Sequence, residues 1–109
     1  MIERAGGGAP TERRADHRIG VLGGRRDANV DPAGVVSPRA TGWGLDWWIG
    51  AEDRWRIPAR EAAVRQQLLD DMPVVQTAMR VPGGDAVQRV YAAPVGDVGE
   101  VAVVEIANE

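Results

Sequence analysis

Apolar and polar residues alternate along the chain after residue 42, and this period of two predicts β-strands. In the first such stretch, large apolar residues occupy every second position: Trp43, Leu45, Trp47 and Ile49. The positions between them hold Gly44, Asp46, Trp48 and Gly50. Successive side chains of a strand point to opposite faces, so this pattern indicates a strand with one buried face. We therefore expect a half-buried strand over 43–50 and a turn after it.

The clearest predicted element is a β-hairpin over 73–94. Gly83 and Gly84 suit a tight turn of the primed type, because such a turn needs positive φ at its central positions. The expected cross-strand pairs are Val81 with Ala86, Met79 with Gln88, Thr77 with Val90, and Val75 with Ala92. This register gives one largely apolar face. The opposite, more polar face carries Gln76, Arg80, Arg89 and Tyr91.

Two further segments complete the predicted sheet. Residues 101–107, with the sequence VAVVEIA, are apolar at nearly every position, which favours a strand covered on both faces. Ala59–Leu69 fits two structures. Pro58 before it and the Glu61/Arg65 pair favour a helix, whereas the alternation of its residues favours a strand.

Glycine and proline interrupt the first forty residues repeatedly. We expect an irregular N-terminal arm over 1–40, with one or two edge strands at best, and an antiparallel β domain over 41–109. The predicted fold is mainly β: an antiparallel meander that forms a β-sandwich or part of one. The last strand reaches Glu109 without a closing turn, so we expect a fragment, or one sheet of a larger sandwich.

The composition narrows the classes of function. The chain has 109 residues, 44% of them hydrophobic, which fits one globular domain. A net charge of -3 disfavours nucleic acid as a partner, since phosphate contacts need clustered cations. With no cysteine and one histidine, His17, we expect no metal and no cofactor. No window approaches the roughly 20 apolar residues of a membrane span, so we expect no membrane partner and a cytoplasmic location.

A glycine-rich stretch precedes two arginines in GVLGGRRD, residues 20–27. Such a loop can cradle phosphate when it joins a strand to a helix and ends in Gly-Lys-Ser/Thr. Both features are missing here, so the sequence does not predict a phosphate-binding loop.

All four tryptophans fall within GWGLDWWIGAEDRW, residues 42–55. Burial in the core or at a domain interface is expected for Trp43 and Trp47, which share a face of the predicted strand, and half-burial for Trp55 at a strand end. Trp48 and Asp46 share the other face, where a flat ring can stack on a sugar and a carboxylate can accept hydroxyl protons. The candidate ligand-binding residues are Trp48, Asp46, Trp55, Arg89 and Tyr91. A simpler interpretation of the two hairpin residues is a solvated face whose long side chains cover apolar surface.

The run SPRATGWGLDWWIGAEDRWRIPAREAAVRQQLLDDMPVVQTAMRVPGGDAVQRVYA, followed by VVEIANE, resembles the N-terminal β-sandwich domain of actinobacterial-type glycogen-debranching and six-hairpin glycosidase-like proteins. The resemblance covers roughly residues 35–109. It rests on the order of an aromatic strand, the VPGGDAV hairpin and the VVEIAN strand, none of which is a catalytic signature. It implies that Ala59–Leu69 is a strand.

In such proteins the sandwich precedes an (α/α)6 barrel, which carries the two spaced carboxylates that glycoside hydrolysis requires. Glu52 and Asp53 are adjacent and do not form such a pair, so no catalytic residue is expected here. The resulting hypothesis is a noncatalytic β-sandwich module of a carbohydrate-active, glycosidase-like protein, which acts as a scaffold and helps to position substrate. Its partners would be carbohydrate and a C-terminal catalytic domain. The alternative is a free-standing protein-protein interaction domain that self-associates through an apolar sheet face.

Overall fold

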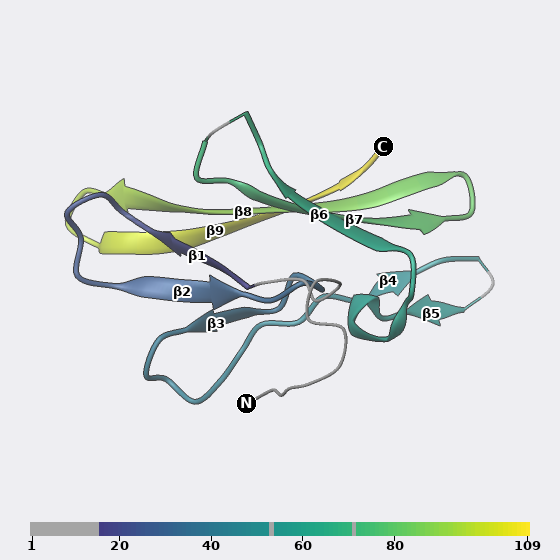
Figure 1. The fold of residues 1–109 in the computed structure, drawn as a ribbon, viewed down its shortest axis with the longest axis horizontal. Coiled ribbons are helices and arrows are strands. Elements are labelled where there is room, and N and C mark those ends of the chain that lie inside the picture. The colour runs from purple at the N-terminus through teal and green to yellow at the C-terminus, as the bar shows by residue number, and fades with distance from the viewer. Residues whose placement is uncertain (1–15, 53, 71) are drawn as a thin grey trace, which may run out of the picture.

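The computed structural model describes residues 16–52, 54–70 and 72–109, which form two facing layers of antiparallel sheet (Figure 1). One layer is a four-stranded sheet with its strands in chain order: β6 (Val64–Leu68), β7 (Val75–Val81), β8 (Gly84–Val95) and β9 (Gly99–Asn108). The other contains a three-stranded sheet of β1 (His17–Gly20), β2 (Asp27–Val30) and β3 (Val36–Pro38), and a two-stranded sheet of β4 (Ile49–Gly50) and β5 (Trp55–Arg56). The prediction of a mainly β, antiparallel, sandwich-like fold is confirmed.

The second layer, which contains β1–β5, begins in a region that we expected to be irregular. Residues 17–38 form three strands, so the prediction of one or two edge strands at best is wrong for this part; residues 1–15 of the predicted arm lie outside the described residues. The strands contribute Ile19, Ala28, Val30 and Val36 to the core. Strands of three or four residues are too short to show a period of two in the sequence, and most of the glycines and prolines lie in the turns between them.

The predicted strand over 43–50 is much shorter in the structure. Only Ile49–Gly50 forms a strand, and Leu45 makes an isolated antiparallel bridge to Val36. The segment between them follows an irregular path along the second layer. The reason is tertiary, because the indole of Trp47 turns inward to donate a hydrogen bond to the carbonyl oxygen of Ala33 at 2.8 Å. A regular strand would instead have buried Trp43 and Leu45 with it.

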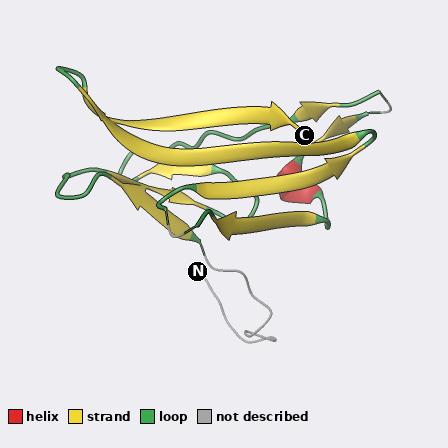
Figure 2. Cartoon of the chain, turned by 90° about the horizontal axis from the view of Figure 1, so that it is seen from above, coloured by secondary structure: helices red, strands yellow, loops and turns green. Residues whose placement is uncertain are grey.

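Both alternatives for Ala59–Leu69 occur, in succession. A short 3-10 helix, η2 (Pro58–Arg60), is the red turn in Figure 2, and β6 follows four residues later. Proline at the first helical position suits such a turn. The rest of the segment is captured by β7, to which β6 pairs along its whole length, so neighbouring backbone overrides helix propensity here.

The β7–β8 hairpin is present, but its register differs from the prediction by two residues. The loop consists of Pro82 and Gly83, with Gly83 at φ 88°, and Val81 faces Gly84. Proline followed by a residue with positive φ is the pattern of a type II turn. The predicted turn at Gly83-Gly84 is therefore wrong. A shift of two residues keeps every side chain on its predicted face, and the two faces are as expected.

The observed register aligns a polar row across three strands of the inner face. Gln66 of β6 pairs with Thr77 of β7, which pairs with Gln88 of β8. Thr77 and Gln88 are fully buried. In the predicted register Thr77 would have faced Val90 instead. The row gives the sheet a polar centre, and such a centre is stable only when its groups find partners.

The partner of this row is the β2–β3 turn, residues 31–35, which we call the docked turn. Its own shape is set by Asp31, whose Oδ1 accepts hydrogen bonds from the backbone of Ala33 at 2.8 Å and Val35 at 3.0 Å. Gly34 occupies the left-handed region at φ 91°, which glycine adopts without strain. Aspartate at the start and glycine near the end make this a compact turn with outward-facing carbonyl groups.

Three side chains bind the carbonyl oxygens of the docked turn. Gln66 Nε2 donates to Asp31 at 2.7 Å, Gln88 Nε2 to Gly34 at 2.9 Å, and Trp47 Nε1 to Ala33 at 2.8 Å. Gln66 also donates to Thr77 Oγ1 at 3.0 Å. The turn therefore joins the two layers through hydrogen bonds at the centre of the interface.

Two hydrophobic clusters flank the docked turn. One joins the three-stranded sheet to the large sheet through Val75 and Val90, with Ile19, Ala28, Val30 and Val36 opposite. The other contains Trp47, Val64, Met79 and Ala86. The inward residues of β7 are therefore the apolar Val75, the polar Thr77 and the apolar Met79.

The prediction that β9 is covered on both faces is wrong, because none of its ten residues is buried. β9 pairs with β8 alone among the described strands, and Ile106 is 52% exposed. The second layer is narrower than the four-stranded sheet, and two clefts border the inner face of β9, one at Ala102 and one at Ile106. The apolar content of this segment did not distinguish an edge strand from a central strand.

Candidate functional site

Two exposed tryptophans meet at the β4–β5 hairpin, and we call Trp48, Trp55 and Asp46 the tryptophan corner. The indole centroids of Trp48 and Trp55 are 6.4 Å apart, with an angle of 67° between the ring planes. Trp48 is 57% exposed and Trp55 65% exposed. The corner thus presents two apolar surfaces at a steep angle to each other.

Both rings of the corner are held in place by local contacts. Asp46 accepts a hydrogen bond from Trp48 Nε1 at 3.1 Å through one oxygen and from the Trp47 backbone at 2.8 Å through the other. Trp55 faces Gly50 across the hairpin, and a Cβ at Gly50 would lie 3.4 Å from the Trp55 ring. Fixed rings lose less conformational entropy when they bind a ligand.

The other two tryptophans, Trp43 and Trp47, differ from each other in burial, although the sequence predicted the same environment for both. Trp47 is buried, as predicted, with 7% of its surface exposed, whereas Trp43 is 60% exposed and is no part of the core. Trp43 lies outside the core because residue 43 is not in a strand that faces the sheet, and its burial at a domain interface stays a prediction. Trp55 is also more exposed than the half-burial expected of it.

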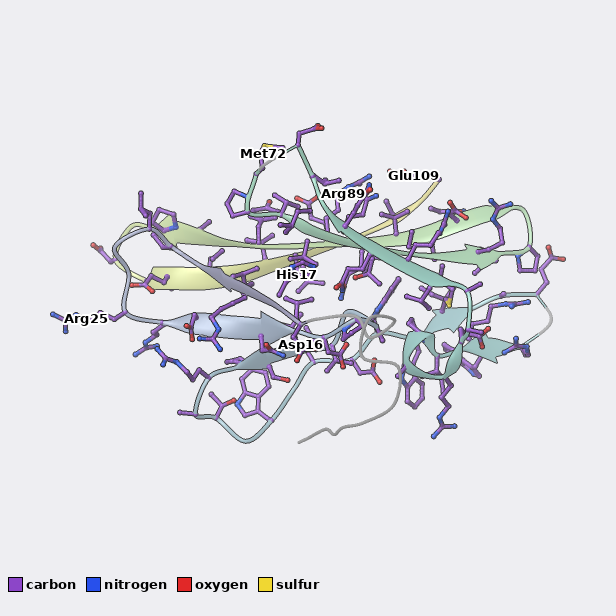
Figure 3. All side chains as sticks on the ribbon, viewed as in Figure 1. Asp16, His17, Arg25, Met72, Arg89 and Glu109 are labelled. Atoms are coloured by element: carbon purple, nitrogen blue, oxygen red, sulfur yellow. The ribbon has the colours of Figure 1, made fainter. Side chains whose placement is uncertain are left out.

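The remaining candidate residues lie in the other layer. Arg89 Nε donates to Gln76 Oε1 at 2.9 Å, and its Nη2 donates to Glu109 at 2.8 Å on the outer face of the four-stranded sheet (Figure 3). The Tyr91 hydroxyl donates to Glu105 at 2.8 Å. This bond raises the pKa of Tyr91 above 10.0, because the phenolate would face a carboxylate. The structure does not bring these two residues to the tryptophan corner.

The outer face of the sheet is a network of satisfied polar groups. Asp85 accepts hydrogen bonds from Arg65 at 2.9 Å and Arg80 at 2.8 Å. The bond from Arg65, assisted by Arg80, holds the pKa of Asp85 below its ordinary value of 3.8. Val87 is buried beneath this polar surface. The arrangement fits long side chains that cover apolar surface with their stems.

A second region, which sequence reasoning did not identify, surrounds Trp43. One cleft of about 380 Å³ lies between the layers, and its lining includes Ile19, Ala28, Ala92 and Ala102. A neighbouring hollow of about 560 Å³ is lined by Arg25, Arg26, Arg39 and Thr41. Arg26, Asp27, Pro38 and Trp43 border both. The signal in the sequence was the Arg25-Arg26 pair, but its neighbours come from segments far apart in the chain.

The described residues hold neither a candidate metal site nor a candidate membrane-spanning helix. Residues 16–52, 54–70 and 72–109 contain no group of three or more His, Cys, Asp or Glu side chains placed to hold a metal ion. Within the same ranges, no helix has the length and apolar character needed to cross a membrane.

The fold and the two sites define a small antiparallel β protein with exposed aromatic surface and no recognisable catalytic constellation among its described residues. The chain matches no protein-family model, and comparison with curated proteins and with solved structures found no match. The resemblance to glycosidase-like N-terminal domains therefore stays a prediction.

Proposed function

We propose that this chain is a noncatalytic β-sandwich module of a carbohydrate-active protein and that its tryptophan corner contacts sugar. The observation that carries the proposal is the pairing of two indoles, each more than half exposed, 6.4 Å apart on one hairpin. Exposed tryptophan in a rigid setting is costly for a surface that binds nothing, because each ring leaves a large apolar area in water.

The chemistry of the corner suits a pyranose. A sugar ring has an apolar face of C–H groups, which can stack on one indole while its rim contacts the other. Each carboxylate oxygen of Asp46 already accepts one hydrogen bond and keeps a lone pair for a sugar hydroxyl. The module would act as a scaffold that positions substrate for a catalytic domain.

Titration with a linear α-glucan such as maltoheptaose tests the proposal, with tryptophan fluorescence as the readout. We expect a saturable change in emission, and Trp48→Ala should weaken binding about tenfold or more, the loss of roughly one good contact. Trp43→Ala is the matched control, since this tryptophan is equally exposed and outside the corner. No saturable response, or equal losses in both variants, would contradict a sugar-binding role of the corner.

A second function, a protein interaction domain, is favoured by one observation. β9 is an edge strand of ten residues, and the cleft of about 450 Å³ beside it exposes Ile106 next to Ile49 and Val81. An apolar edge of this length can pair with another strand. Size-exclusion chromatography with light scattering separates the two functions. An association that Ile106→Lys abolishes would support the interaction domain. A monomer at all concentrations would exclude self-association.

A further inference from the structure

We infer that the region around Trp43 is a binding site for an amphipathic anion, a small molecule with an acidic head and an aliphatic chain. The site consists of the apolar cleft between the layers and the arginine-lined hollow beside it. Neither compartment includes a residue of the tryptophan corner, so this inference does not depend on the proposed function.

The apolar compartment exists because small residues face each other between the layers. Ala28 of β2, Ala92 of β8 and Ala102 of β9 line the cleft. One pleat further along β2 and β8, Val30 and Val90 fill the same interlayer space as part of the core. Alanine therefore leaves a slot where valine would have closed it, and the slot is continuous with exposed surface at Trp43.

The second compartment is electropositive. Its lining includes Arg25, Arg26 and Arg39 against one acidic residue, Asp27. Arg39 is paired with Asp27 at 2.8 Å, but no acidic side chain in the described part of the chain pairs with the guanidinium of Arg25 or Arg26. Guanidinium groups bind carboxylate, sulfate and phosphate with charge-assisted hydrogen bonds.

The backbone under these two arginines is fixed by an unusual contact. Glu100 of β9 accepts hydrogen bonds from the backbone N–H of Arg25 at 3.2 Å and of Arg26 at 3.0 Å. A Cβ at Gly24 would lie 2.7 Å from that carboxylate, so glycine allows the close approach. Glu100 also lines the cleft, but each of its carboxylate oxygens already accepts one of these backbone hydrogen bonds. The two arginine side chains remain available to a ligand, and Arg25 extends away from the body of the protein in Figure 3.

The position of Arg26 joins the two compartments. Arg26 and Trp43 border both the apolar cleft and the cationic hollow. A ligand with its chain in the cleft would therefore place its acidic group near Arg26, with the Trp43 ring along its stem. Both volumes, about 380 and 560 Å³, lie within the range of small-molecule sites, which is about 300–1,000 Å³. Charge and shape together favour a fatty-acid-like ligand over a neutral lipid or a cation.

Sodium decanoate, used below its micellar concentration, is the probe, and titration calorimetry with the full chain is the measurement. We expect saturable binding, a fluorescence change that is absent in Trp43→Phe, and about tenfold weaker binding for Arg26→Gln. Arg26→Lys should recover part of the loss. Arg60→Gln is the matched control, because Arg60 is an exposed arginine that lines neither compartment.

Comparisons with two other ligands and with the Arg26→Gln variant decide whether the inference holds. Acetate, which has the head without the chain, and decyltrimethylammonium, which has the chain with the opposite charge, should bind at least tenfold more weakly than decanoate. Equal binding of decyltrimethylammonium would overturn the inference, since it would indicate adsorption to apolar surface. No saturable binding of decanoate, or unchanged binding by a folded Arg26→Gln variant, would overturn it as well. Circular dichroism of each variant establishes that it is folded.

Discussion

Replacement of Gly34 by alanine probes the docked turn at its most crowded point. A Cβ at this position would lie 2.5 Å from Gln88 Oε1, 2.8 Å from Trp47 Nε1 and 3.2 Å from Thr77 Oγ1. These atoms belong to both layers. The methyl group must therefore displace the side chains that hold the turn, or the turn must move away from the sheet.

The expected loss has two parts. A residue other than glycine at φ 91° costs about 1–2 kcal/mol of backbone strain. Overpacking of a filled site costs about 1–3 kcal/mol more. The sum is about 2–5 kcal/mol, a large share of the stability of a domain this small.

Gly83→Ala separates the two parts. Gly83 has nearly the same φ, 88°, but no atom lies within 4 Å of its added Cβ. This variant should lose the backbone part alone, about 1–2 kcal/mol. The difference between the two variants then measures the contact between the turn and the sheet.

Urea denaturation followed by circular dichroism measures both free energies of unfolding. We expect Gly34→Ala to be less stable than Gly83→Ala by about 1–3 kcal/mol. Equal losses in the two variants would refute the reasoning, because they would mean that the turn does not pack against the polar row. An unfolded Gly34→Ala beside a folded Gly83→Ala would agree with it.

The remaining predictions concern single side chains. Tyr91 is the only tyrosine, so ultraviolet titration should give one phenolate curve with a midpoint above 10.0, and Glu105→Gln should lower it. Because the pKa of Tyr91 is raised in the folded state, the contribution of the Tyr91–Glu105 hydrogen bond to stability is present below pH 10 and is lost as the pH rises through the folded-state pKa. A wild-type midpoint at 10.0 would contradict this hydrogen bond. Asp85 has a lowered pKa, so its stabilisation is present above pH 3.8 and is lost as the pH falls through the folded value. The stability difference between wild type and Asp85→Asn should accordingly shrink in acid, and a difference that persists there would exclude this ion network. Trp47→Phe removes the donor to the docked turn and part of a buried ring, and should cost at least about 1–3 kcal/mol in urea denaturation; an unchanged free energy of unfolding would contradict the inward placement of this indole.

The candidate site was only partly visible in the sequence. The sequence placed Asp46 and Trp48 on one face, and the structure joins them by a hydrogen bond, whereas the contact of Trp48 with Trp55 was not predicted. Arg89 and Tyr91 were placed on the correct face of the hairpin, but that face belongs to the other layer. Nothing in a linear pattern relates two sheets that pack through side chains.

The cleft at Trp43 could not be found in this way at all. Its lining comes from β1, β2, β3, β8, β9, the β1–β2 turn and the irregular segment after β3. Alanine in a strand is unremarkable in a sequence. It leaves a cavity only when another alanine lies opposite, and that depends on how the layers meet.

The sequence alone determined that β7, β8 and β9 are strands and which face each residue of the β7–β8 hairpin occupies. This information is local, because the period of two survives any even shift in pairing. The register, the edge position of β9 and the burial of one tryptophan out of four were decided by tertiary structure. For the register and for Trp47, a distant segment set the outcome: the docked turn accepts hydrogen bonds from Gln66 and Gln88 of one polar row and from the indole of Trp47. Hydrogen bonds between buried polar groups carry a high cost when they are unmade, so they select one arrangement among several that hydrophobic alternation allows.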